Sequence, residues 1–95
     1  MDGQKLFDKM INDIKMFLEN TPEDIFDFSV DLEHYLALHY KEMAKAQPAA
    51  VDILEEEVPD ICAAGEPGMS KAEIEEFKRL LNTEYEKALK AVVQR

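Results

Sequence analysis

Apolar residues recur at intervals of three and four positions along four separate stretches of the chain. This spacing places them on one face of an α-helix, because a helix completes a turn in about 3.6 residues. The first stretch predicts a helix over residues 3–19 that ends at Asn20. The last stretch predicts a helix over residues 71–93, whose apolar line continues to Val92.

The second stretch predicts a helix over residues 22–46 and carries the clearest start signal. Thr21 is a residue type that caps helices, and Pro22 suits the first helical position. Glu23 and Asp24 would then lie in the first turn, where the helix dipole favours negative charge. Two neighbouring apolar lines run along this segment, so we expect it to be broadly apolar and central.

The third stretch predicts a helix over residues 48–64 that begins at Pro48. Pro59 lies inside this segment. A proline has no N–H group to donate, and its ring disfavours helical geometry at the preceding residue. We therefore expect the third helix to be kinked or broken near Pro59, with residues 60–64 as a last short turn.

A loop over residues 65–68 is followed by Ser70 and Glu73, which have the spacing of a capping box at a helix start. Four helices joined by short connections predict an all-α, up-and-down antiparallel four-helix bundle. A chain of 95 residues is the length of one domain, so we expect residues 1–95 to form a single helical domain.

The composition is strongly acidic, with 21 Asp and Glu, 11 Lys and Arg, and a net charge of −10. Such a surface repels nucleic acid and anionic membranes, so we expect neither as a direct partner. The N-terminus lacks the pattern of a signal peptide, and no apolar run approaches the roughly 20 residues of a membrane span. A single cysteine, Cys62, cannot form an internal disulfide, and we expect a cytoplasmic protein.

The negative charge is concentrated in two segments. Residues 16–40 and residues 46–70 each contain six acidic side chains and no Lys or Arg. Asp27 and Asp31 are like charges at i,i+4 spacing, which costs a helix a few tenths of a kcal/mol. Local helix stability therefore does not account for them. Two explanations remain, a general effect on solubility and an anionic surface that a basic partner neutralises.

Catalytic chemistry has little support in the sequence. His34 and His39 are five residues apart, so they point to different faces of a helix and do not form a pair of metal ligands. His39 falls on an apolar line and is expected at the core or its boundary. Cys62 is expected to be buried, and the anion of nearby Asp60 lowers thiol reactivity. We expect no enzyme activity, no catalytic residue, no metal and no cofactor.

Three segments, IFDFSVDLE at 25–33, VPDICA at 58–63 and EPG at 66–68, follow one another in the acidic part of the chain. Together they resemble small acidic immunity proteins of bacterial polymorphic toxin systems, including the contact-dependent growth inhibition type. The resemblance covers roughly residues 20–70. It implies an inhibitor that binds a cognate toxin domain, often a basic nuclease, with acidic side chains in place of nucleic-acid phosphates. The partner-binding residues that it implies are Glu23, Asp24, Asp27, Asp31, Glu55, Glu56 and Asp60.

Two alternatives belong to other functional classes. The chain could be a structural or adaptor bundle that forms a homodimer through exposed apolar residues of the helix at 22–46, or a DNA mimic that occupies a DNA-binding protein. An inhibitor is compatible with a monomer or a weak dimer, whereas the structural bundle requires a dimer. For an inhibitor, Phe26, Tyr35 or Tyr40 could supply the aromatic anchor that often contributes most to binding.

Overall fold

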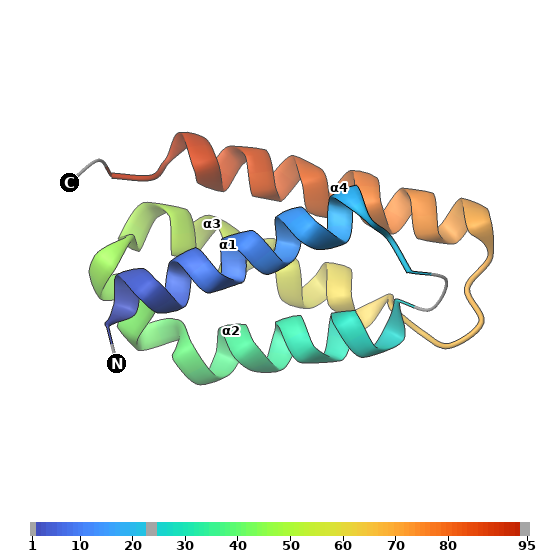
Figure 1. Ribbon diagram of the computed structural model, residues 1–95, viewed down its shortest axis with the longest axis horizontal. Coiled ribbons are helices and arrows are strands. Elements are labelled where there is room, and N and C mark those ends of the chain that lie inside the picture. Colours follow the sequence, from blue (N-terminus) through green and yellow to red (C-terminus); the bar gives the residue numbers. More distant parts are fainter. Residues whose placement is uncertain (1, 23–24, 94–95) are drawn as a thin grey trace.

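Burial of one apolar stripe from each helix organises the molecule. The computed structural model describes residues 2–22 and 25–93. Within those residues the chain forms four helices and no strand, namely α1 (Gly3–Glu19), α2 (Phe26–Ala46), α3 (Pro48–Ala63) and α4 (Lys71–Lys90). Consecutive helices run in opposite directions (Figure 1), and each packs most extensively on its neighbour in the sequence. The predicted all-α antiparallel four-helix bundle is confirmed.

The core is one cluster of apolar side chains from all four helices. The bundle measures 40 × 23 × 21 Å. Burying a Leu, Ile or Met side chain contributes about 1.5–3 kcal/mol, so this cluster is the main source of stability. The most deeply buried large side chains are Met10, Ile14, Ile25, Leu36, Met43, Leu54 and Leu81.

Side-chain caps define the starts of α1 and α4. A carboxylate oxygen of Asp2 accepts a hydrogen bond from the backbone N–H of Gln4 at 2.9 Å. Ser70 and Glu73 form the predicted capping box, in which each side chain accepts a hydrogen bond from the other residue's backbone N–H. The bond from the Ser70 N–H lowers the pKa of the Glu73 carboxyl below its ordinary value.

The start of α2 differs from the prediction. The helix begins at Phe26 with buried Ile25 at the N-cap position, whereas the sequence predicted a start at Pro22 with a Thr21 cap. The Thr21 hydroxyl instead donates to the carbonyl oxygen of Phe17 at 3.0 Å, which satisfies a group at the end of α1. Glu23 and Asp24, predicted for the first turn, lie outside the described residues.

The third helix passes Pro59 without a break. α3 is continuous from Pro48 to Ala63, so the alternative of a broken helix is wrong. Val58 and Ile61 on either side of this proline are buried in the core, and Pro59 itself is half-buried. Core packing on both sides keeps the segment helical, although Pro59 cannot donate a backbone hydrogen bond.

At one end of the bundle, Gln47 forms hydrogen bonds with residues near the start and near the end of the chain. It lies between α2 and α3, and its side chain is buried. Its amide nitrogen donates to the side-chain oxygen of Gln4 at 2.8 Å and to the carbonyl oxygen of Val93 at 3.2 Å. Its amide oxygen accepts from the Val93 N–H at 2.7 Å. These bonds hold Val93 out of the helical pattern, and α4 ends at Lys90 rather than at the predicted residue 93.

Two glycines allow close approach between elements. A Cβ at Gly3 would overlap the carbonyl oxygen of Glu42, and a Cβ at Gly65 would overlap the side chain of Ser29. The first contact sets the start of α1 against the end of α2. The second places the α3–α4 loop against the first turn of α2, and larger residues would force these elements apart.

Gln47→Ala should lower the free energy of unfolding by about 1–3 kcal/mol, because it removes three hydrogen bonds of a buried amide and leaves their partners unpaired. Gln4→Ala is the matched control, since it removes only one of these bonds and should cost about 0.5–1.5 kcal/mol. Chemical denaturation measures both. Equal losses in the two variants would contradict a central role for Gln47.

Candidate partner-binding surface

Eight acidic side chains of α2 and α3 are exposed and form no ion pair within the described residues. Within residues 27–33 and α3 they are Asp27, Asp31, Glu33, Asp52, Glu55, Glu56, Glu57 and Asp60, and all eight are exposed. The ion pairs of the described residues involve other acids: Lys9 pairs with Asp13 on α1, Lys45 with Glu42 near the end of α2, and Arg79 with Glu76 and Lys87 with Glu84 on α4. The negative charge of these eight side chains is therefore not neutralised by an ion pair with the described part of the chain.

The predicted site residues do not converge on one groove. Asp31 lines a groove between α1 and α2, Glu55 lines one between α2 and α3, and Asp60 lines one between α3 and α4. Asp27 lies one turn before Asp31, and Glu56 is exposed on α3 beside Glu55. The acids form a broad surface that extends around α2 and α3, not a single pocket.

Glu33 and Glu55 both line the α2–α3 groove. The Tyr40 hydroxyl donates to a carboxylate oxygen of Asp52 at 3.0 Å across the same helix pair. This hydrogen bond raises the pKa of Tyr40 above its ordinary value. The sequence analysis did not select Glu33, because only the pairing of α2 with α3 shows that it lines the same groove as Glu55.

Cys62 is buried below this surface. Burial, together with the smaller effect of the negative charge of Glu33, raises the pKa of its thiol to about 12. A thiol with this pKa is almost wholly protonated at neutral pH and is a poor nucleophile. The expectation of a buried cysteine is confirmed.

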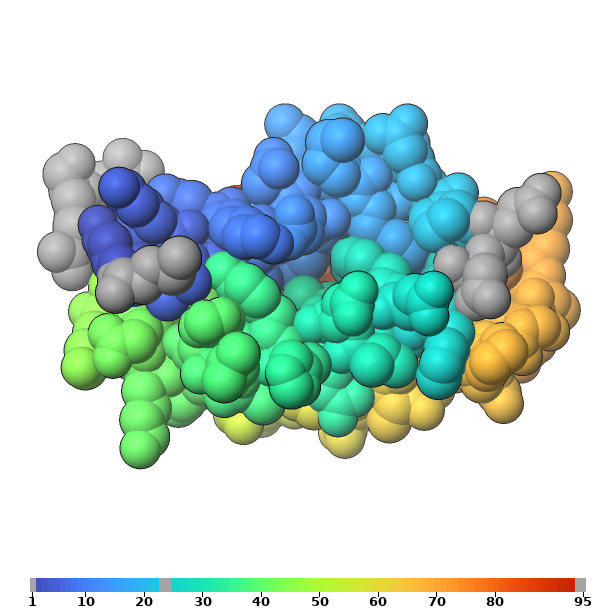
Figure 2. Space-filling model, turned by 60° about the horizontal axis from the view of Figure 1, so that its bottom comes forward, coloured from blue at the N-terminus to red at the C-terminus, as the bar shows by residue number. Residues whose placement is uncertain are grey.

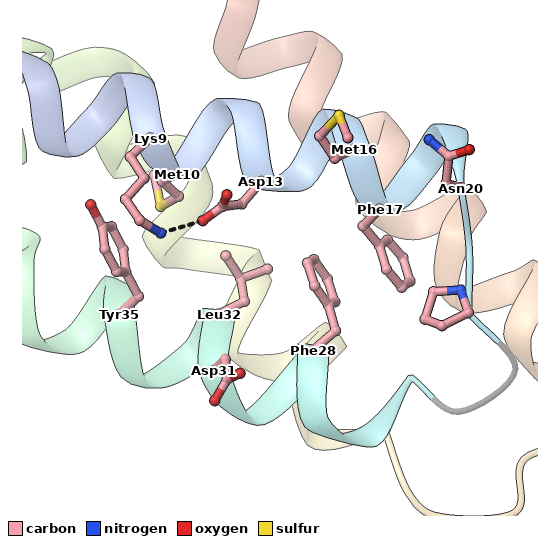
Figure 3. Close-up of a pocket in the computed structure, with 11 residues that line it drawn as sticks. Lys9, Met10, Asp13, Met16, Phe17, Asn20, Phe28, Asp31, Leu32 and Tyr35 are labelled. Atoms are coloured by element: carbon pink, nitrogen blue, oxygen red, sulfur yellow. Dashed lines mark hydrogen bonds and ion pairs between the residues drawn. The ribbon is translucent and has the colours of Figure 1, made fainter.

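An apolar groove of about 500 Å³ separates α1 from α2. Figure 2 shows this face of the molecule, where the blue residues of α1 meet the green and teal residues of α2. Inside it the rings of Phe17 and Phe28 are stacked, with centroids 3.9 Å apart and planes 6° apart (Figure 3). Leu32 and Met10 also line the groove, and Met16 lies on its α1 side. The Met16 side chain is 52% exposed, so the apolar lining reaches the surface.

A lysine, a carboxylate and a tyrosine occupy one end of this groove. The Lys9 ammonium forms an ion pair with Asp13 at 2.6 Å, which raises the pKa of Lys9 (Figure 3). The same ammonium lies 5.0 Å from the centre of the Tyr35 ring. The Tyr35 hydroxyl donates to the carbonyl oxygen of Leu6 at 2.8 Å, and burial raises its pKa. This end of the groove is internally neutralised and held by hydrogen bonds.

Asp31 lies on the α2 side of the groove, along the helix between Tyr35 and Phe28 (Figure 3). In Figure 3 its carboxylate points away from α1 and out of the groove, and the side chain is exposed. The sequence identified the charge of Asp31 but not the groove beside it. Apolar spacing shows which side of a helix is buried, whereas a groove depends on how far two helices separate.

The histidines do not form a metal site. His39 is half-buried, and its ring lies 4.6 Å from the ring of Tyr35, as expected for a residue at the core boundary. His34 is exposed on α2. Across the described residues, no three His, Cys, Asp or Glu side chains group as metal ligands.

These features define a single four-helix domain with an anionic surface over two neighbouring helices and an apolar groove at its border. No match to the chain was found among known protein families, curated proteins or solved structures. No helix in the described part of the chain is long and apolar enough to cross a membrane.

At pH 8, Cys62 in the folded protein should react with an aromatic disulfide reagent at least about 100-fold more slowly than in the unfolded chain. The reason is that its raised pKa lowers the fraction of the thiol that is present as the reactive thiolate. The thiol's pKa is higher in the folded state, so its contribution to stability is complete below about pH 9 and is lost as the pH rises towards 12. Stopped-flow absorbance with and without denaturant measures the reaction rates. Similar rates in both states would show that Cys62 is accessible.

Proposed function

We propose that this chain is an inhibitory binding protein that neutralises a basic protein partner through the acidic surface of α2 and α3. The observation that carries the proposal is the set of eight exposed acids on these two helices, none of which is in an ion pair within the described residues. Unpaired charges of one sign steer a partner of opposite charge and speed its association.

A nuclease toxin domain is the partner class that fits this surface best. A nuclease binds phosphates through Lys and Arg side chains, and closely spaced carboxylates can occupy the same positions. The acids extend over three neighbouring grooves, an arrangement suited to a broad protein surface rather than to a small ligand. The resemblance of residues 20–70 to immunity proteins of toxin systems supports the same class. The proposal assigns no catalytic residue to this chain.

A homodimeric structural bundle is the second candidate. Val30 and Leu38 are 47% and 66% exposed on α2, and His34 lies midway between them at i,i+4 spacing. Such a line could pair with the same line of a second copy. However, Asp27 and Asp31 lie beside it and would repel their counterparts, so the basic partner is favoured.

The decisive measurement begins with capture on the immobilised chain from the cells that express it, with elution in a rising salt gradient. A basic protein released only at high salt is then assayed for nuclease activity with and without this chain. An unrelated DNA-binding protein as the captured partner would support a DNA mimic. Recovery of the bait alone, as a stable dimer by light scattering, would support the structural bundle.

The paired reversals Asp27→Lys with Asp31→Lys, and Glu55→Lys with Glu56→Lys, should each weaken binding of the captured partner by about 10-fold or more at low salt. They should leave the helical circular dichroism unchanged, because all four side chains are exposed. Isothermal titration calorimetry measures the affinities. The loss should shrink at high salt, where surface charges are screened.

The matched control is Glu75→Lys with Glu86→Lys on α4, which changes the net charge equally at exposed positions outside the acidic surface. It should weaken binding by less than about 3-fold. If the control weakens binding as much as the other two pairs do, overall charge and not the α2–α3 surface determines the affinity.

A further inference from the structure

The α1–α2 groove adds an apolar site to the border of the acidic surface. We propose that this groove receives the apolar face of a basic amphipathic helix of the protein partner. This inference rests on the proposed function and specifies how the partner is held. Charge alone brings proteins together but provides modest affinity, whereas buried apolar anchors supply most of the binding energy in an interface.

The shape of the groove fits a helix. On α1 it extends from Lys9 to Asn20, a length of about 16 Å at 1.5 Å per residue, or about three helical turns. A helix laid along such a groove presents anchors at i, i+3 or i+4, and i+7. A volume of about 500 Å³ holds a few large side chains but not a whole helix, so the partner's backbone would lie above the groove.

Much of the groove is lined by aromatic and aliphatic side chains that suit apolar anchors of a partner. The stacked rings of Phe17 and Phe28 lie between the two helices, with Leu32 beside them (Figure 3). Aromatic faces and a flexible methionine suit the side chains of another helix, and Met16 lies exposed where such a helix would enter. Phe17 and Leu32 are already buried, so a partner would remove from water mainly the exposed Met16 and the half-buried Phe28.

The charges beside this groove favour a basic partner. Asp31 lines it and has no ion pair within the described residues, and Asp27 is one turn away. Lys9 is the one basic side chain among the lining residues, and Asp13 neutralises it. A Lys or Arg that flanks the partner's anchors can therefore pair with Asp31. A second copy of this chain, with its net charge of −10, would bring like charges together.

The test uses three synthetic peptides of about 16 residues, long enough for roughly four helical turns. The first has Leu on one face and Lys on the other. The second replaces each Lys with Glu, and the third replaces each Leu with Gln. Calorimetry measures binding to the intact chain, and amide chemical shifts in ¹⁵N-labelled protein locate it. Only the first peptide should bind, and the largest shifts should lie along α1 and the first half of α2.

Two single variants examine the apolar and the charged contact separately. Met16→Gln should weaken binding of the Leu–Lys peptide by about 5-fold, which corresponds to the loss of an apolar contact of about 1 kcal/mol. Asp31→Asn should weaken binding of the same peptide by about 3-fold at low salt and should have little effect on the affinity at high salt. The matched controls on α4 are Leu89→Gln and Glu86→Gln, also exposed, and neither should change the affinity. Circular dichroism confirms that each variant is folded.

Several outcomes would overturn the inference. These are no binding of the Leu–Lys peptide, equal binding of the Leu–Glu peptide, or shifts confined to α3 and α4. Equal binding of the Leu–Glu peptide would instead mark a site for apolar ligands of any charge. If the peptide fails while a basic partner is still captured in a salt-sensitive manner, the groove is excluded and the proposed function stands. If the peptide binds in the groove but no basic partner is captured, the groove is a binding site for a basic helix and the proposed inhibitory function is excluded.

Discussion

The packing of α2 between α1 and α3 is the constraint on which the surface depends. Ile25, Leu32, Leu36 and Met43 must all enter the core, and this requirement fixes the rotation of α2 about its axis. With that rotation set, Asp27, Asp31 and Glu33 can only face water. The same helix then borders two grooves, an apolar one shared with α1 and an acidic one shared with α3. The acidic surface is thus a consequence of how the core is filled.

One end of the bundle is held by hydrogen bonds that apolar packing cannot provide. Buried Gln47 pairs with Gln4 near the chain start and with Val93 near its end, so it links segments that no helix connects. Gly3 meets the backbone of α2 at the same end of the bundle. A domain stabilised in this way can carry unpaired charges on α2 and α3, because the repulsion between neighbouring like charges costs only a few tenths of a kcal/mol per pair.

Much of the fold followed from local signals. The four helices, the capping box at Ser70 and the start of α3 at Pro48 depend on residues close in sequence, and all are present in the structure. The failures occurred where distant contacts override such signals. Pro22 and Thr21 have the features of a helix start, but the helix begins at Phe26, after the N-cap residue Ile25 enters the core. Gln47 holds Val93 outside α4 by hydrogen bonds across 46 positions of sequence.

The sequence by itself determined the number of helices, their buried sides and the two segments that carry the negative charge. Those properties depend on residue type and on the helical repeat. Only the tertiary structure decided which acids share a groove, that Glu33 and Glu55 line the α2–α3 groove whereas Asp31 lines the α1–α2 groove, and that Phe17 and Phe28 stack between α1 and α2. The reason is physical: the helical repeat orients side chains around one axis, but the spacing and contacts of two axes arise only when the helices pack together.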